Sequence, residues 1–429
     1  MFDHTYIDRV PGALAEKVCY FIASSSEGFI LDHPQIVLKP GREKPVRQHH
    51  PWIFSGAIAK EPKVGSIEPG SIVDIVDSKG QWLAKGYYNL KSQIRSRVLS
   101  WTNESIDESF WAKKIAASCQ RRMPLFEAGT NDTLRMVFSE SDGLPGLVAD
   151  LYGDYLVIQL LAAGTDRVRR EILAGFRQAL PHLKGIYERS DDQGRKLEGL
   201  EFVSAVAWGA CPTDGVTHIH ENGLAYEVDF AKGHKTGFYI DQRDSRQWLR
   251  GYAKGKSVLN CFAYTGGFSI AASVGGATSV TSVDVSGPAL ATAKRNAGAN
   301  SVGANMEWVE ADVFAYLRQQ RDSGRKWDVI VLDPPKFAQH AGQINQAARG
   351  YKDILMQAIG LLNPGGRVAT YSCSGHISED LFQKICFGAT VDAGVTMQIQ
   401  KKFMQAPDHP VALNFPESFY LKGLLLELI

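Results

Sequence analysis

The sequence predicts an α/β protein whose C-terminal half is a doubly wound parallel sheet, preceded by a small β-rich domain and an α+β middle domain. Three observations carry this expectation. From residue 256 onward, apolar strand-like runs alternate with helical patterns; short β-rich runs broken by glycine and proline turns fill residues 36–101; and residues 108–225 mix both patterns. Regular alternation is typical of a parallel sheet covered by helices on both faces.

Composition narrows the class of protein. The 429 residues are enough for two or three domains, and 47 Lys and Arg nearly cancel 46 Asp and Glu. Any nucleic-acid binding must therefore depend on local patches. Six cysteines without a CxxC pair indicate a reducing compartment. No apolar run is long enough to cross a bilayer and no signal peptide is recognisable, so we expect a cytoplasmic protein without a membrane partner.

The composition shifts along the chain predict four segments. They are an N-terminal extension at 1–34, the β-rich domain at 35–104, the middle domain at 105–225 and the doubly wound domain at 226–429. The first segment matches no strong period and is either a short ordered appendage or a disordered tail.

A basic and aromatic stretch opens the β-rich domain. The sequence "KPGREKPVRQHHPWIF" supplies Lys39, Arg42, Lys44, Arg47 and Trp52. Basic side chains can meet phosphates while a ring stacks on a base, so this stretch is a candidate RNA-binding edge. A solvated loop with Trp52 as an anchor explains the same residues equally well.

The middle domain shows helical spacing at 108–122 and 166–180, with two strands joined by a turn at 146–161. Nothing in this segment has the pattern of a metal or nucleophile site. Five strands are then expected in the C-terminal part, with a sixth strand closing the edge of the sheet: 257–262, 277–285, 306–312, 327–333, 366–374 and finally 419–429.

Ligands of such sheets bind beyond the carboxyl ends of the strands, and those ends carry a consistent set here. Gly266 and Gly267 allow a tight turn after the first strand, and Asp284 ends the second, where it could bond a ribose. Asp312 and Asp333 end the third and fourth strands. The third glycine of GxGxxG and a P-loop lysine are both missing, which favours S-adenosylmethionine over a ligand with a diphosphate.

The segment "HKTGFYIDQR" (234–243) precedes the first strand and would lie over the same site. The full set of candidate cofactor residues is Gln242, Arg243, Asn260, Phe262, Tyr264, Thr265, Gly266, Gly267, Asp284, Asp312 and Asp333.

Several motifs together resemble one known family. They are "HKTGFYIDQR", "VLNCFAYTGGFS", "VDVSGPALATAKRN", "DVIVLDPPKFA", "RGYKDI", "SCSGHI" and "DHPV". The chain is similar to the class I, Rossmann-like methyltransferases that make 5-methylcytosine in 23S ribosomal RNA, the RlmI type. The resemblance implies S-adenosylmethionine as cofactor, large-subunit ribosomal RNA as partner and an N-terminal PUA domain that binds RNA. It leaves open whether the protein is a monomer or a homodimer.

Cys373, in "SCSGH", is the candidate nucleophile. Cytosine C5 becomes nucleophilic only after a thiolate adds to C6, and this chemistry needs a cysteine beside the methyl donor. Asp333 could orient the base or remove the C5 proton, and Lys336 could offset charge on the base or phosphate. Many RNA cytosine-C5 methyltransferases carry a second cysteine after the fourth-strand motif, whereas this chain reads "DPPK". No metal is expected.

Two other functions remain open at this stage. "DPP" is similar to the loop of amino-directed adenine or guanine methyltransferases, although Lys336 stands where their stacking aromatic residue follows and Phe337 comes one later. A non-catalytic RNA-binding assembly factor would keep the fold and transfer no methyl group.

Overall fold

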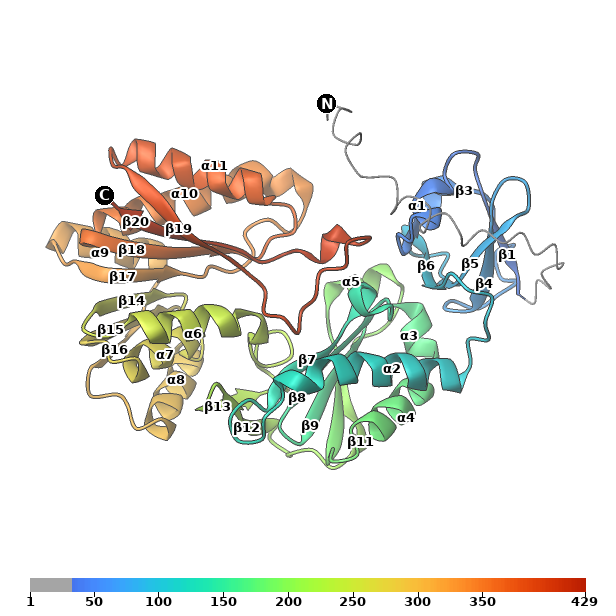
Figure 1. The fold of residues 1–429 in the computed structure, drawn as a ribbon, viewed down its shortest axis with the longest axis horizontal. Coiled ribbons are helices and arrows are strands. Elements are labelled where there is room, and N and C mark those ends of the chain that lie inside the picture. The colour runs from blue at the N-terminus through green and yellow to red at the C-terminus, as the bar shows by residue number, and fades with distance from the viewer. Residues whose placement is uncertain (1–32) are drawn as a thin grey trace, which may run out of the picture.

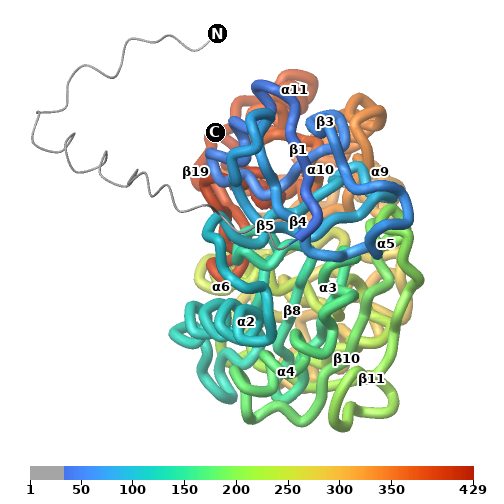
Figure 2. Tube along the Cα trace, turned by 90° about the vertical axis from the view of Figure 1, so that its right-hand side faces the viewer, coloured from blue at the N-terminus to red at the C-terminus, as the bar shows by residue number. Residues whose placement is uncertain are grey.

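The computed structural model describes residues 33–429, which form three main sheets in chain order (Figure 1). The predicted extension, apart from its last two residues, lies outside the described part, as does Cys19. Figure 2, viewed from the N-terminal domain, shows the blue N-terminal strands above the middle domain. The C-terminal sheet forms the other end of the molecule in Figure 1.

The N-terminal domain is a six-stranded sheet in the order β2-β6-β5-β4-β1-β3, with one short helix, α1 (Lys44–Arg47). Strand residues such as Ile36, Leu38, Val73 and Ile75 are buried in its core. The predicted β-rich domain is therefore confirmed. Its strands are β1 (Gln35–Leu38), β2 (Trp52–Phe54), β3 (Ile58–Lys60), β4 (Ile72–Val76), β5 (Trp82–Tyr88) and β6 (Ile94–Ser100).

The middle domain is a five-stranded sheet in the order β11-β10-β9-β8-β7. Helices α2 and α4 pack together and bury Ile115, Ile172 and Phe176 in the core that also covers the sheet. The elements are α2 (Glu108–Arg122), β7 (Thr133–Phe138), β8 (Leu147–Tyr152), β9 (Tyr155–Leu160), α3 (Ala163–Arg167), α4 (Arg169–Ala179), β10 (Gly185–Ser190), α5 (Gln193–Leu197) and β11 (Val203–Gly209).

A hairpin joins the middle and C-terminal domains. Strands β12 (Val216–Glu221) and β13 (Leu224–Asp229) pair antiparallel. Tyr226 of this hairpin shares a buried cluster with Tyr152 of the middle domain and Ile270 of the C-terminal domain. The expected boundary between residues 225 and 226 falls inside β13.

The C-terminal domain is a seven-stranded sheet in the order β16-β15-β14-β17-β18-β20-β19, and its first five strands are parallel. The doubly wound prediction is confirmed. Its strands are β14 (Ser257–Cys261), β15 (Ser279–Asp284), β16 (Met306–Glu310), β17 (Trp327–Leu332), β18 (Leu362–Ser372), β19 (Met397–Met404) and β20 (Lys422–Leu428).

One part of that prediction was wrong. The last strand, β20, does not close the edge, because it lies antiparallel between β18 and β19. The edge strand is β19, which the sequence analysis missed. Five consecutive residues of β19, from Gln398 to Lys402, are exposed, so it lacks the apolar run that marked the other strands.

Helices cover both faces of this sheet (Figure 1). Leu259 and Cys261 point to the face covered by α9, α10 and α11, whereas Val258 points to the face covered by α6 and α7. This alternation follows from the two-residue repeat of a strand. The helices are α6 (Arg243–Tyr252), α7 (Gly267–Val274), α8 (Gly287–Ala299), α9 (Val313–Ser323), α10 (Ile344–Gly360) and α11 (Glu379–Asp392).

Candidate active site

A cavity of about 360 Å³ lies beyond the carboxyl ends of β14, β15, β17 and β18. The segment 234–246 forms another wall, and Tyr420 and Leu421 contribute from the residues just before the last strand. Parallel strands place their carboxyl ends at one edge, so residues far apart in the sequence meet there.

The turn after β14 forms the floor of the cavity. Phe262 and Tyr264 adopt left-handed backbone conformations, with φ of 60° and 48°. Gly266, with φ of 84°, is the residue before α7, and its conformation suits a glycine. The amide of Asn260 donates to Ser269 Oγ at 2.8 Å, tying the strand to the helix. Phe262, Tyr264, Thr265 and Gly267 line the cavity, while Asn260 and Gly266 lie outside its lining.

Asp284 lies where the sequence placed it, at the end of β15 and in the cavity wall. Its carboxylate accepts hydrogen bonds from the backbone amides of Tyr264 and Ser286, each at 2.8 Å. The side chain is thereby fixed in direction, as a ribose-binding carboxylate must be.

Two further predicted cofactor residues lie outside the cavity wall. Asp312 caps helix α9 by accepting from the amide of Ala315 at 2.9 Å, and it is absent from the cavity wall. Arg243 is buried and paired with Asp408. By contrast, Gln242 lines the cavity, where its buried amide lies beside the Asp333 carboxyl group.

An aromatic wall rises from the segment before β14. The ring of His234 stacks on Tyr264 with centroids 4.7 Å apart, and Tyr239 meets Tyr264 edge to face at 5.4 Å. The Tyr264 hydroxyl accepts from the His234 amide and donates to the Gly237 carbonyl. Sequence reasoning missed His234 and Tyr239, and the density of aromatic residues in "HKTGFY" was the signal that could have found them.

Cys373 and Asp333 lie on neighbouring strands. Cys373 follows β18, Asp333 follows β17, and both line the cavity together with Lys336. Burial and the nearby charge of Asp241 raise the pKa of Asp333 to about 7. Burial also raises the pKa of the Cys373 thiol, an effect that Lys235 opposes. The site therefore holds a half-buried thiol beside a carboxyl group that exchanges protons near neutral pH.

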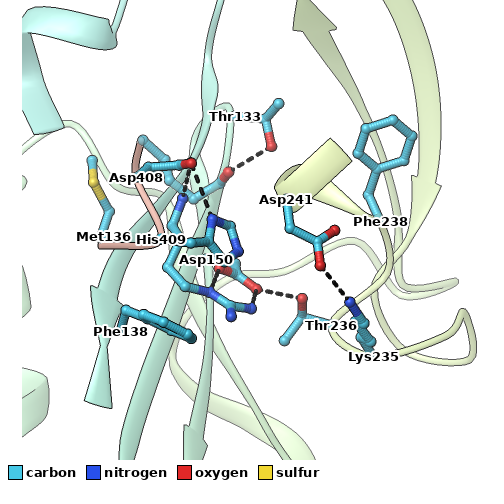
Figure 3. Close-up of polar contacts among 12 residues, drawn as sticks. Thr133, Met136, Phe138, Asp150, Lys235, Thr236, Phe238, Asp241, Asp408 and His409 are labelled. Atoms are coloured by element: carbon cyan, nitrogen blue, oxygen red, sulfur yellow. Dashed lines mark hydrogen bonds and ion pairs between the residues drawn. The ribbon is translucent and has the colours of Figure 1, made fainter. Parts of the chain in front are cut away.

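Lys235 and Asp241 form an ion pair in the cavity wall (Figure 3). The Lys235 ammonium lies 2.8 Å from an Asp241 oxygen, and Tyr420 donates its hydroxyl proton to the same carboxylate. Burial alone would raise the pKa of Asp241, but Lys235 and His409 outweigh it and hold that pKa well below its usual range. Asp241 is therefore ionised at neutral pH, and its negative charge helps to raise the pKa of Asp333.

The "DPPK" loop divides into two parts. Lys336 is exposed at the mouth of the cavity, whereas Phe337 packs against Tyr351 at 4.7 Å and Phe314 at 6.1 Å in the core. Phe337 is also absent from the cavity wall, so the ring that could have stacked on a base points elsewhere.

Comparison with known proteins agrees with this geometry. Residues 135–410 match the S-adenosylmethionine-dependent methyltransferase family, and residues 36–101 match a PUA-like domain. The chain is 47% identical over 394 residues to the ribosomal RNA large subunit methyltransferase I of Klebsiella pneumoniae, covering 91% of this chain and 97% of that protein. The protein of the same name from Erwinia tasmaniensis is 45% identical, with 92% and 99% covered. The chain belongs to the ribosomal RNA large subunit methyltransferase I family.

Solved structures support the family's fold and cofactor. A methyltransferase in complex with S-adenosylhomocysteine is 25% identical, with a TM-score of 0.79, covering 92% of this chain and all of that one. A methyltransferase from Streptococcus mutans, at 24% identity and the same TM-score, shows the same fold. The cofactor is S-adenosylmethionine.

The residues present fit this cofactor. The hydroxyl of Thr265 in the turn is buried without a hydrogen-bond partner in the described structure, and Gln242 brings a buried amide to the same wall. Buried polar atoms are nearly always paired, so such atoms in a cavity wall indicate groups that a ligand satisfies. Asp284 adds an oriented carboxylate, and none of these residues supplies the cationic cradle that a diphosphate would need.

The basic stretch of this family member is only partly available to RNA. Lys39, Arg42 and Lys44 are exposed, while Arg47 pairs with Asp77 at 2.8 Å. RNA binding by these three exposed cations, of which Lys39 also donates to the Gly56 carbonyl at 3.0 Å, stays a prediction.

Trp52, also predicted to bind RNA, lies between domains instead. Its indole N–H donates to Glu140 at 2.7 Å, and its ring meets Phe415 edge to face at 4.7 Å. Arg97 lies over the other part of the ring and pairs with Glu140. The structure thus favours the anchor over the base-stacking interpretation, because Trp52 joins the N-terminal domain to the middle domain and to the segment between β19 and β20.

The remaining described cysteines do not compete with Cys373. Cys119, Cys261 and Cys386 are buried in hydrophobic cores, and Cys211 is half-buried beside the hairpin cluster. Within residues 33–429, no group of three or more His, Cys, Asp or Glu side chains could hold a metal ion. Over the same range, none of the helices has both the length and the apolar character needed to cross a membrane.

Proposed function

We propose that the protein methylates C5 of a cytosine in large-subunit ribosomal RNA through a covalent bond between Cys373 and C6 of the base. The relatives' name supplies the RNA class. The observation that carries the mechanism is the shared cavity, in which a thiol and a carboxyl group on adjacent strands face the cofactor turn.

The reaction requires three acts from this chain. When bound, S-adenosylmethionine supplies an electrophilic methyl group. The Cys373 thiolate adds to C6, which makes C5 nucleophilic and lets it take that methyl group, so that S-adenosylhomocysteine is left as the neutral product. A base then removes the C5 proton, and the electron pair of the C5–H bond restores the C5–C6 double bond as the C6–S bond breaks. The cysteine leaves as the thiolate that began the cycle.

Asp333 is the group best suited to remove the C5 proton. Its pKa of about 7 matches the working pH, which is the condition for an efficient general base. The Asp333 carboxylate forms when its proton passes to solvent, and because burial disfavours the charge, the carboxylate then readily accepts a proton. Lys336, exposed at the mouth, would offset the charge of the base or a neighbouring phosphate.

Two alternatives have less support. Amino-directed methylation needs a ring after the prolines to hold the flipped base, and Phe337 is packed in the core. A non-catalytic assembly factor has no use for a thiol and a carboxyl group of raised pKa beside the cofactor turn. Because the substrate is ribosomal RNA, we place the enzyme in the cytoplasm.

Nucleoside analysis tests this proposal. The protein is incubated with S-adenosylmethionine carrying a labelled methyl group and a large-subunit RNA transcript, and the RNA is digested to nucleosides. We expect the label in 5-methylcytidine, and its loss in Cys373→Ser. Cys211→Ser, which changes a half-buried cysteine outside the cavity, should retain activity. Label in an N-methylated adenine or guanine that survives Cys373→Ser would refute the proposal, and so would an absence of label with both naked RNA and isolated subunits.

A further inference from the structure

Lys235 has an unusual place in the cavity wall. Its backbone is left-handed, with φ of 53°, although it is not a glycine. Its ammonium lies 4.4 Å from the centre of the Tyr239 ring and 5.7 Å from that of Tyr420, besides its ion pair with Asp241. A non-glycine residue rarely adopts this conformation and persists in it only where the surroundings impose it.

The middle domain imposes that conformation through the next residue. Thr236 is fully buried and donates its hydroxyl proton to Asp150 of β8. The hydroxyl of Tyr152, also on β8, lies 2.9 Å from Thr236 Oγ1 and accepts from the amide of Phe238 at 3.2 Å. Figure 3 shows Thr236 directed toward Asp150 and Lys235 toward Asp241.

Asp150 is itself fixed. Arg135 of β7 donates hydrogen bonds to both Asp150 oxygens at 2.7 and 2.8 Å, and the Asp150 side chain is completely buried. A bidentate arginine–carboxylate pair fixes direction as well as charge. The position of the Lys235 backbone is therefore set by a rigid strand pair of a different domain.

Charged and titratable groups approach Cys373 from every neighbouring element. The segment before β14 contributes Lys235, Asp241 and Tyr239, and the end of β17 contributes Asp333. Helix α10 contributes Tyr351, the residues just before β20 contribute Tyr420, and β20 itself contributes Lys422.

These groups act in opposite directions. Lys235 favours the thiolate, while the two carboxylates oppose it. The Lys422 ammonium also interacts favourably with the Cys373 thiolate, and it donates to the carbonyl of Ser374 at 2.8 Å, which supports the turn that carries the cysteine.

We propose that Lys235 is a positioning residue that stabilises the Cys373 thiolate, and that the middle domain holds it in place through Thr236. The inference rests on the proposed role of Cys373 as nucleophile. It assigns the middle domain a part in catalysis, because a shift of β8 against the C-terminal sheet would carry Lys235 away from the cavity.

The test measures the thiolate directly and needs no RNA. The full chain is treated with iodoacetamide between pH 6 and 10, and alkylation of Cys373 is followed by peptide mass spectrometry. Lys235→Gln should raise the apparent pKa by roughly half a pH unit to one pH unit and slow alkylation at pH 7 by about three- to tenfold. Lys235→Arg, which keeps the charge, should restore most of the rate.

Matched variants separate charge from structural damage. Asp241→Asn removes a carboxylate that opposes the thiolate, so the apparent pKa should move down, opposite to the Lys235→Gln shift. Lys232→Gln, an exposed lysine of the same segment outside the cavity wall, should leave the profile unchanged.

Three results would overturn the inference: an unchanged profile in Lys235→Gln, shifts of the same sign in both cavity variants, or a raised KM for S-adenosylmethionine as the only effect of Lys235→Gln. Failure of the proposed function is distinct, since it would appear as absent 5-methylcytidine with the alkylation shift intact.

Discussion

Asp333→Asn should make the protein more stable at pH 8 and leave its stability at pH 4 nearly unchanged. The folded pKa of about 7 exceeds the ordinary value of 3.8, because burial and the charge of Asp241 disfavour the carboxylate. Between these values the native protein holds a proton that the unfolded chain has lost, so stability falls as pH rises through this window. A shift of about three pH units corresponds to about 4 kcal/mol, which asparagine would recover.

Thermal unfolding of the two proteins across pH 4 to 8 measures this effect. At about 2 to 4 °C per kcal/mol for a domain of this size, Tm at pH 8 should rise by roughly 8 °C or more. Methyl transfer should be lost in the same variant.

Asp328→Asn is the matched control, on β17, the strand that Asp333 follows. Burial raises the pKa of Asp328, but hydrogen bonds from Ser257 and Asn363 outweigh it and hold the pKa below its usual value. That carboxylate stabilises the native protein above pH 3.8, and the benefit is lost on acidification, so its asparagine variant should be less stable at pH 8. An Asp333→Asn variant that is no more stable at pH 8, or equally stabilised at pH 4 and 8, would refute the reasoning.

Three further predictions follow from single contacts. Gly237→Ala should lower stability by about 1 to 3 kcal/mol and raise the KM for S-adenosylmethionine, because φ is 131° and an added Cβ would lie 2.6 Å from a β13 side-chain atom. Denaturant unfolding and titration with the cofactor measure the two effects, and unchanged values would contradict the prediction. Trp52→Ala should release the N-terminal domain from its contacts and speed proteolysis of the segment 101–107. Equal cleavage rates in the variant and the unchanged protein would contradict this. Replacing Lys39, Arg42 and Lys44 together by Gln should reduce the salt slope of RNA binding by about 2, and an unchanged slope would exclude them as phosphate contacts.

The pattern of apolar and turn residues along the chain was sufficient to predict the parallel sheet. The apolar runs of β14, β15, β17 and β18 and the turn residues that follow them could be found in the sequence, because buried parallel strands are marked by continuous apolar residues. The same pattern placed Cys373 and Asp333 at one edge, where the structure puts both in one cavity. The polar strand β19 could not be found in this way, because its residues face solvent.

Contacts between distant segments could not be predicted. Trp52 meets Phe415 across the domain boundary, and no spacing rule links positions so far apart. Arg243 was expected at the cofactor but pairs with Asp408, for the same reason. Lys235 was not among the predicted site residues, since its charged partners become neighbours only after the sheet has formed.

The central claim is that Cys373 bonds to C6 of a cytosine, and a trapping experiment tests it most directly. The protein is incubated with S-adenosylmethionine and large-subunit RNA containing 5-fluorocytosine, whose fluorine cannot leave C5 as a proton does. The account predicts a covalent protein–RNA band on a denaturing gel, with the RNA remnant on the Cys373 peptide and no band in Cys373→Ser. No band, while ordinary RNA is still methylated by Cys373→Ser, would contradict it.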